Sequence, residues 1–267
     1  MTQLRELIIV IKGGGEMASA VAWRLYRANL QKILMLETDN PLAVRREVSF
    51  CEALHEGRMA VEGIEAVRVQ GLADTYLAWE QGNIAVAADP HWHLAAQIHP
   101  DLVVDAILAK SNLGTRMQEG KLVIGLGPGF SAGEDVHMVV ETNRGHDLGR
   151  IITAGPAEPN TGIPGPIGGF TEERVLRAPI DGKFTARLSI GDHVKKDDIV
   201  GFVQEAKILA KIGGVIRGLI RSETQVTSGL KIGDIDPRGQ QHYCYTISDK
   251  ARAIGGSVLE ALLRVFN

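Results

Sequence analysis

A continuous β-branched run near the start of the chain, followed at once by a glycine cluster, constrains the fold most. Residues 7–11 read Leu-Ile-Ile-Val-Ile, which is typical of a strand buried on both faces of a parallel sheet. Three glycines follow at 13–15, residues 17–30 place apolar side chains at helical spacing, and a second apolar run at 33–36 precedes Glu37. This order of strand, glycine turn, helix and strand predicts a βαβ unit.

Short apolar runs alternate with helical patterns through the first half of the chain. We expect further strands or hairpins at 60–69, 84–88, 102–108 and 122–126, and helices at 43–56 and 75–81. Five or six short strands separated by helices are typical of a doubly wound α/β fold. The sequence therefore predicts a Rossmann-like domain with a parallel sheet over residues 1–153.

The second half of the chain has a different character. Residues 154–169 hold five Gly and four Pro, so we expect a linker over 154–170. Residues 178–203 and 210–235 then align without gaps at an offset of 32 positions, which identifies an internal repeat. Two such halves predict a small all-β domain over 171–236.

The last segment, 237–267, is expected to return to the first domain. Residues 243–247 favour a short strand, and 253–266 carry an apolar stripe at helical spacing. A helix with one apolar face must pack on something, and the α/β domain is the simplest partner.

Composition excludes several classes of partner. The net charge is −3 and aromatic residues make up 5%, whereas nucleic-acid binders carry basic faces or stacking rings. The run at 7–11 is shorter than the roughly 7–15 residues of a signal-peptide core, and no apolar stretch approaches the roughly 20 residues that span a bilayer. We expect a cytoplasmic homo-oligomer with no nucleic-acid or membrane partner. The histidines at 91, 93 and 99 lie in one connecting segment without further evident ligands, so no metal is predicted.

The glycine turn matches a dinucleotide-binding motif. It reads G-x-G-x-x-A between a strand and a helix, with Glu37 placed where a carboxylate binds the ribose hydroxyls of NAD. The alternative is a β–α turn that binds nothing. The predicted cofactor is NAD or a related nucleotide, held by Gly13, Gly14, Gly15, Glu16, Met17, Ala18 and Glu37.

Two further groups are candidate anion sites. A glycine-rich loop at 125–133 follows an apolar strand, and Gly127 and Gly129 could wrap a second anionic ligand there. Its alternative is a flexible loop. Candidate contacts to substrate or phosphate, which could equally be structural ion pairs or a solvated helix face, are Arg45, Arg46, Asp105 and Lys110. No residue is assigned a catalytic role.

The repeat resembles the barrel-sandwich hybrid fold of biotinyl and lipoyl carrier domains. Those carriers present a modified lysine at the hairpin between the halves, where this chain has Glu205-Ala206-Lys207. The methionines that flank the carrier lysine are missing, so we expect a purely structural hairpin.

The chain as a whole resembles the selenium-dependent molybdenum hydroxylase accessory family. Glu16 stands where that family has Asp, and Gly14 where it has Ala. The segments that carry the resemblance are 11–19, 43–46, 49–50, 56–57, 105–106 with 109–110, 125–130, 141–146, 231–238 and 247–251.

The resemblance implies an accessory factor that matures a xanthine dehydrogenase-like molybdenum hydroxylase. It implies the hydroxylase as partner, and molybdopterin cytosine dinucleotide as a second candidate ligand. Two alternatives stay open: a free-standing NAD-dependent oxidoreductase, and a non-catalytic scaffold that docks the hydroxylase. Whether the chain is an enzyme is left undecided.

Overall fold

The protein is described from a computed structural model, over residues 4–162 and 165–266. It divides into two compact units. Unit 1 comprises Met1–Pro41, Ser49–Thr161 and Ile247–Asn267, and unit 2 comprises Leu42–Val48 and Gly162–Thr246. The division differs from the expected boundaries, because a short excursion at 42–48 and the segment 237–246 both belong to unit 2.

Unit 1 is built on a nine-stranded mixed sheet. Its strand order is β10-β9-β7-β6-β1-β2-β5-β4-β3, parallel from β9 to β4 with an antiparallel strand at each edge. The strands are β1 (Ile9–Lys12), β2 (Ile33–Glu37), β3 (Arg58–Val61), β4 (Ile64–Val69), β5 (Ile84–Ala88), β6 (Leu102–Asp105), β7 (Leu122–Leu126), β9 (Met138–Val140) and β10 (Ile151–Ile152). A separate two-stranded ladder joins β8 (Ser131–Ala132) and β11 (Gly155–Pro156).

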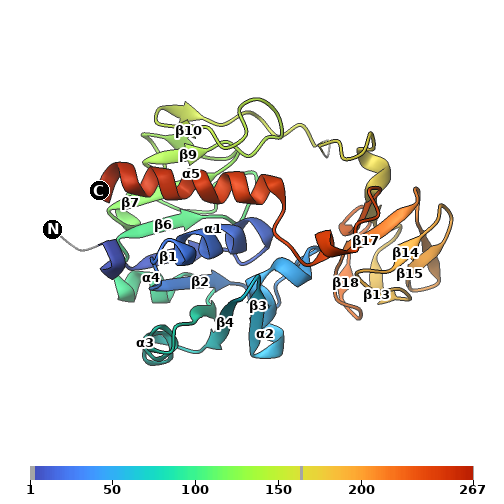
Figure 1. Ribbon diagram of the computed structural model, residues 1–267, viewed down its shortest axis with the longest axis horizontal. Coiled ribbons are helices and arrows are strands. Elements are labelled where there is room, and N and C mark those ends of the chain that lie inside the picture. Colours follow the sequence, from blue (N-terminus) through green and yellow to red (C-terminus); the bar gives the residue numbers. More distant parts are fainter. Residues whose placement is uncertain (1–3, 163–164, 267) are drawn as a thin grey trace. The chain divides into compact units, whose positions relative to one another are not determined.

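Helices cover this sheet. They are α1 (Glu16–Arg27), α2 (Ala53–Glu56), α3 (Leu72–Glu80), α4 (His93–Ile98) and α5 (Asp249–Phe266). Ala78 of α3 and Ala95 of α4 pack in one apolar cluster with Val10 and Val103 of the central strands. Figure 1 shows α5 lying beside α1. Their contact is close, because a Cβ built on Gly255 would lie 2.9 Å from the carbonyl oxygen of Ala20.

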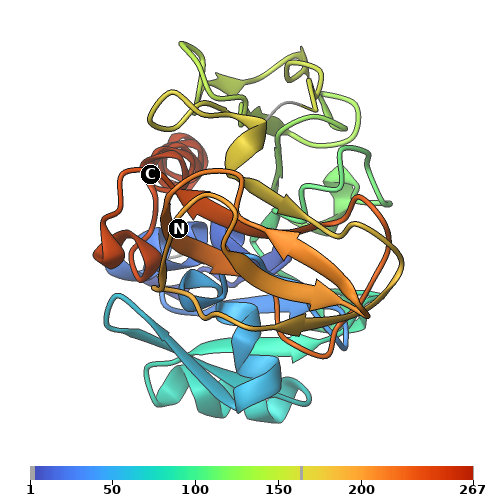
Figure 2. The same ribbon diagram turned by 90° about the vertical axis from the view of Figure 1, so that its right-hand side faces the viewer.

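The internal repeat explains the architecture of unit 2. Its first half gives β13 (Gly182–Ala186), β14 (His193–Val194) and β15 (Ile199–Val203), and its second half gives β17 (Gly214–Leu219), β18 (Gln225–Val226) and β19 (Lys231–Asp236). A further strand directly precedes each half and is counted with it here: β12 (Val175–Arg177) before the first and β16 (Ala206–Leu209) before the second. The two four-stranded antiparallel sheets have the orders β12-β19-β17-β14 and β16-β15-β13-β18. Figure 2 turns these strands toward the viewer. Each sheet takes two strands from each half, so neither half can form its sheet alone.

Matching glycines begin the equivalent strands of the two halves. Gly182 has φ +146° and Gly214 has φ +155°. A Cβ on Gly214 would press against the carbonyl of Asp236, and one on Gly182 would meet the side chain of Gln204. Only glycine accepts both the conformation and the close approach.

Three local expectations are wrong. Residues 43–56 form no continuous helix: they give short 3₁₀ turns at Arg46–Val48 and Phe50–Glu52 and then α2. The apolar side chains before and after residue 48 belong to two different units, and together they produce a spacing that resembles one helical face. Residues 243–247 form no strand, because the chain turns as a 3₁₀ helix at Gln241–Cys244. The expected linker is partly ordered, since β11 lies within it, while residues 163–164 are outside the described part.

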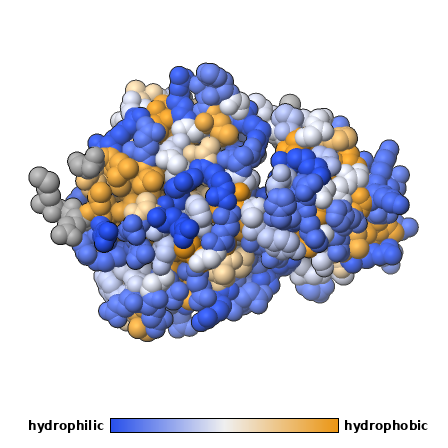
Figure 3. Space-filling view, viewed as in Figure 1, coloured by the Kyte–Doolittle hydropathy of each residue, from blue (hydrophilic) through white to orange (hydrophobic). Residues whose placement is uncertain are grey.

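The protein is therefore a mixed α/β protein with one large mixed sheet, additional antiparallel sheets and a C-terminal helix. In the parts of the chain that are described, no helix is both long and apolar enough to cross a bilayer. Figure 3 shows apolar surface over the C-terminal end of α5, where Leu263 and Val265 are exposed.

Two adjacent glycines of α5 provide a test of its packing. Gly255→Ala should lower the free energy of unfolding by about 1–3 kcal/mol, because the new methyl group would overpack the contact with Ala20. Gly256 has no neighbouring atom within 4 Å of an added Cβ, so Gly256→Ala should raise it by about 0.5–1 kcal/mol through helix propensity. Urea unfolding of the full chain measures both. Equal effects at the two positions would contradict the packing described.

Candidate functional site

The carboxyl ends of the parallel strands bring several of the predicted residues to one edge of the sheet. The glycine turn follows β1, Glu37 ends β2 and Asp105 ends β6. The chain runs from β1 to β2 on one side and returns to β6 on the other, so the strand order reverses between β1 and β6. In open α/β sheets ligands bind outside the carboxyl ends at such a point.

The three glycines of the turn do different things. Gly13 has φ +97°, and a Cβ there would lie 3.0 Å from the carbonyl oxygen of Ala106. Gly14 lies against Cys51, whose amide donates a 3.0 Å hydrogen bond to the Gly14 carbonyl. Gly15 has no atom within 4 Å of a built Cβ. The protein's own chain therefore covers the first two glycines, and the third faces open space.

Glu37 is held in place by backbone amides. Its Oε1 accepts a 2.8 Å hydrogen bond from the Gly14 amide, and its Oε2 accepts a 2.9 Å bond from the Thr38 amide. The side chain is half-buried. The carboxylate thus links the end of β2 to the turn after β1, and the two hydrogen bonds fix its orientation.

The first turn of α1 begins beside this carboxylate. Gly15 is the N-cap of the helix, without a side-chain cap. Glu16 and Met17 are half-buried, and Ala18 is fully buried against the sheet. Such a start leaves the positive end of the helix dipole at the edge of the sheet.

A buried lysine ends the central strand. Lys12 is 0% exposed, and its Nζ lies 2.8 Å from Thr115 Oγ1 and 2.5 Å from Glu119 Oε2. Thr115 Oγ1 in turn donates a 2.7 Å hydrogen bond to Oδ2 of Asp105, and Oδ1 of Asp105 accepts one from the Ile107 amide. One amine, one hydroxyl and two carboxylates therefore form a continuous chain of one ion pair and two hydrogen bonds.

Burial shifts both buried charges toward their neutral forms. It lowers the pKa of Lys12 below its ordinary value, against the hydrogen bond and charge of Glu119 and the charge of Asp105. It likewise raises the pKa of Asp105, against the hydrogen bonds from Thr115 and Ile107. Perturbed pairs of this kind concentrate at functional sites, although structural ion pairs also produce them.

Trp92 closes the cluster from the side of α4. Nζ of Lys12 lies 3.4 Å from the centroid of the Trp92 ring. Trp92 has φ +58° and His99, at the other end of α4, has φ +51°, so both adopt the left-handed conformation. For residues of this size that costs on the order of 1–3 kcal/mol each, and such strain gathers at functional positions.

The predicted anion loop after β7 is packed against its own chain. A Cβ on Gly129 would lie 2.7 Å from the backbone of Ser111, and one on Gly127 would collide with Thr142. Lys110 is exposed and has φ +66°, so it sits in a strained loop above β6. The geometry explains these two glycines by close packing, and an anion-binding role for them and for Lys110 stays a prediction.

Arg45 and Arg46 belong to unit 2, whereas the sheet edge described above belongs to unit 1. The Arg45 guanidinium donates hydrogen bonds of 2.8 and 3.0 Å to the carbonyls of Tyr243 and Thr246. Arg46 donates a 2.8 Å bond to the carbonyl of Leu219. These bonds attach the excursion 42–48 to unit 2. An anionic partner for either side chain stays a prediction.

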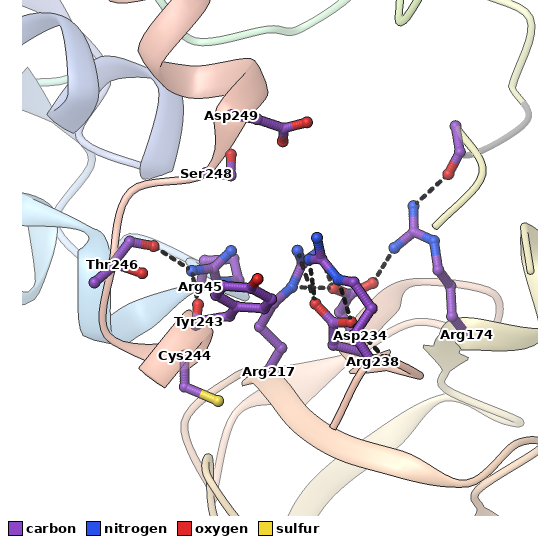
Figure 4. Close-up of polar contacts among 12 residues, drawn as sticks. Arg45, Arg174, Arg217, Asp234, Arg238, Tyr243, Cys244, Thr246, Ser248 and Asp249 are labelled. Carbon is purple, nitrogen blue, oxygen red and sulfur yellow. Dashed lines mark hydrogen bonds and ion pairs between the residues drawn. The ribbon is translucent and has the colours of Figure 1, made fainter. Parts of the chain in front are cut away.

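Unit 2 contains a second charged cluster, drawn in Figure 4. Arg174 and Arg217 both bind the carboxylate of Asp234, which is 1% exposed. Arg238 binds Asp236 through hydrogen bonds of 2.9 and 2.6 Å. Arg217 comes from β17, the two aspartates come from β19, and Arg174 comes from the segment before β12. The ion pairs among them therefore join these three segments.

The sequence did not identify Lys12, Trp92, Thr115 or Glu119 as one cluster. The available signal was a lysine that directly continues a fully apolar strand, since such a residue needs a buried partner. The histidines near α4 do not form a metal centre: within the described residues no three His, Cys, Asp or Glu side chains could hold an ion. Lys207 lies exposed in β16, beyond the turn at Gln204 and Glu205.

Comparison with known proteins gives a sequence relative. The chain is 47% identical over 260 residues to the "Uncharacterized protein YqeB" of Escherichia coli strain K12, which covers 97% of this chain and 48% of that protein. The chain thus spans about half the length of the curated relative it matches. No protein-family model matches it.

Solved structures give only distant similarities. An aspartoacylase family protein from Mesorhizobium loti is 14% identical, with 86% of this chain and 85% of that chain covered and a TM-score of 0.27. A succinylglutamate desuccinylase/aspartoacylase from Rhodobacter sphaeroides is 12% identical, with 86% and 85% covered and a TM-score of 0.25. Scores of this size establish neither a shared fold nor a shared activity.

These comparisons contradict the expected family. The relative from Escherichia coli is described as uncharacterized, and the two solved structures named above are described as an aspartoacylase family protein and a succinylglutamate desuccinylase/aspartoacylase, not as molybdenum hydroxylase accessory factors. The expected family and the expected role in maturation of a molybdenum hydroxylase are therefore wrong, and the hydroxylase as partner stays an untested prediction. Some of the motifs behind it, at 11–19, 105–106 and 125–130, are short Gly, Lys and Asp patterns at the ends of β1, β6 and β7, where close packing and buried charge also require such residues.

The buried cation can be tested by substitution. Lys12→Met should lower the free energy of unfolding by about 3–5 kcal/mol, because it leaves the buried carboxylate of Asp105 and the half-buried carboxylate of Glu119 without their counter-charge. Lys121→Met is the control: its ion pair with Asp101 is 64% exposed on the lysine side and should contribute at most about 1 kcal/mol. Urea unfolding measures both, and equal losses would mean that Lys12 is not a structural centre.

The second cluster predicts a dependence on pH. Burial alone would raise the pKa of Asp236, but the hydrogen bonds from Arg238 and the charge of Arg217 outweigh it and hold the pKa below its ordinary value of 3.8. A depressed carboxyl pKa stabilises the folded state above the unfolded value, and that stabilisation is lost as pH falls through the folded value.

Asp236→Asn should therefore weaken unit 2 at neutral pH and make little difference under strongly acidic conditions. Hydrogen exchange of the β19 amides, corrected for the intrinsic effect of pH, measures this. Asp197→Asn is a control at an exposed, left-handed position of the same unit, which asparagine also tolerates. A difference between wild type and Asp236→Asn that stays constant with pH would contradict the argument.

Proposed function

We propose that unit 1 is a nucleotide-binding domain of Rossmann-like arrangement that takes NAD or a related nucleotide at the carboxyl edge of its sheet. The main support is that the three small residues of the glycine motif are needed for three different reasons. Gly13 makes the tight turn with a positive φ, Gly15 leaves open space for a pyrophosphate, and Ala18 packs the helix onto the sheet. In the same proposal, unit 2 is a barrel-sandwich hybrid domain.

Glu37 supports a ribose contact. Each of its oxygens already accepts one amide hydrogen bond, and a carboxylate has about four acceptor positions, so capacity remains for two ribose hydroxyls. A carboxylate at this place would repel a 2′-phosphate. The proposal therefore favours NAD over NADP.

The N-terminus of α1 supports the phosphate contact. Its N-cap has no side-chain cap, so the first amides of the helix point to the edge where the open face of Gly15 lies. Backbone amides and the helix dipole together favour an anion at such a place. Glu16 in the first turn limits where the phosphate can lie, because its carboxylate would repel a phosphate placed directly over it.

Calorimetric titration tests the proposal with NAD, NADP, AMP and molybdopterin cytosine dinucleotide as probes. We expect NAD or AMP to bind, and NADP to bind at least about tenfold more weakly because of Glu37. Glu37→Gln should reduce this discrimination. If none of the four compounds gives saturable binding, the proposal of a nucleotide site is refuted.

A matched pair of glycine substitutions separates ligand binding from folding. Gly15→Leu should abolish nucleotide binding, because the new side chain fills the open space, and it should leave stability nearly unchanged since Gly15 has φ −70°. Gly71 caps α3 in an extended conformation and also faces open space, so Gly71→Leu should leave nucleotide binding intact. Binding that survives Gly15→Leu would place the nucleotide elsewhere.

A further inference from the structure

We propose that the pocket between α4 and the 3₁₀ turn η4 (Met117–Glu119) binds a small planar anion, of the chemical class of an aromatic carboxylate. The pocket has a volume of about 590 Å³. Its lining combines an indole with cationic or titratable side chains and small apolar ones, among them Trp92, His91, His99, Arg116, Glu119 and Ala95. It contains neither the glycine turn nor Glu37, so it is separate from the proposed nucleotide contacts.

Trp92 supplies the surface for a planar ligand. One face of its ring carries the buried ammonium group of Lys12 at 3.4 Å from the centroid, and the half-exposed indole also lines the pocket. A cation on one face draws electron density toward itself, which favours an electron-rich ring stacked on the other. An aromatic anion fits this requirement better than a saturated or cationic molecule.

The charges of the pocket favour a carboxylate on that ring. Glu119 is the acidic lining residue, and its Oε2 lies 2.5 Å from Nζ of Lys12, an amine that also faces Asp105 through Thr115. Arg116 is exposed, and its guanidinium forms no ion pair with the described residues. His91 and His99 add two imidazole rings to the lining. A bound carboxylate can thus accept hydrogen bonds from Arg116 without competing for Lys12.

The walls of the pocket are fixed before any ligand arrives. Trp92 and His99 hold left-handed conformations at the two ends of α4, and Asp89 caps the helix by accepting a 2.7 Å hydrogen bond from the Leu94 amide. A Cβ built on Gly114, which has φ +116°, would lie 3.9 Å from Cζ3 of the indole. A bulky residue is kept in such a conformation only where its surroundings over-determine it, and here the indole both contacts Lys12 and lines the pocket.

Three probes of matched size test the proposal by calorimetry: benzoate, benzamide and cyclohexanecarboxylate. Benzoate should bind saturably. Benzamide lacks the charge and cyclohexanecarboxylate lacks the planar ring, so each should bind at least about tenfold more weakly. Equal affinity for the three compounds, or no saturable binding of benzoate, would overturn the proposal.

Variants locate the benzoate. Trp92→Leu and Arg116→Ala should each weaken it at least about tenfold, with circular dichroism confirming the fold. Trp23→Leu is the matched control, since Trp23 also faces a cation, Arg252 at 5.2 Å, but lies on α1 outside the pocket. An equal loss in the control, or unchanged affinity in both pocket variants, would contradict the assignment.

The Gly15→Leu variant separates this proposal from the nucleotide site. It should keep its affinity for benzoate whether or not the wild type binds a nucleotide, because Gly15 does not line the pocket. Loss of benzoate binding in this variant would mean that the two ligands share one site, and would overturn the assignment to the α4 pocket.

Discussion

The buried charge of Lys12 is the constraint on which the arrangement of unit 1 depends. β1 is a central strand, and its other three residues are fully buried and apolar. A cation at its end can be accommodated only if other segments bring counter-charges to it. Asp105 comes from the neighbouring strand, and Thr115 and Glu119 come from the connection that follows. The long connection between β6 and β7 is therefore attached to the centre of the sheet, and the strained Trp92 covers the remaining side.

The regular elements could be predicted from the sequence because their signals are local. Continuous apolar runs correctly gave β1, β2, β5 and β7, since a strand buried on both faces needs no partner to be recognised. The repeat gave the strands of unit 2, because equivalent positions 32 residues apart, such as Gly182 and Gly214, meet the same steric requirement. What it could not reveal was the exchange of strands between the two sheets, which depends on pairing between the halves.

Segments whose side chains serve distant partners were not predictable. Residues 43–56 carry apolar residues at helical spacing, yet Arg45 is bound by carbonyls near residue 245, and Cys51 is bound by the glycine turn. Periodicity cannot distinguish one helical face from two short stretches that pack in different places. The buried cluster was missed for the same reason: Lys12 is recognisable only once Asp105 and Glu119 are known to lie beside it.

The glycine turn shows why a motif alone does not identify a site. Gly13 and Gly14 are required by the contacts with Ala106 and Cys51, whether or not a ligand binds. Only Gly15, whose surroundings are open, is a glycine that packing does not demand. Packing therefore explains two of the three glycines. The third, Gly15, needs another explanation, such as the close approach of a ligand to its backbone. Trp92 differs from Gly15, because its left-handed backbone has a structural reason, the contact of its ring with Nζ of Lys12 at 3.4 Å, while the same ring also lines the pocket beside α4.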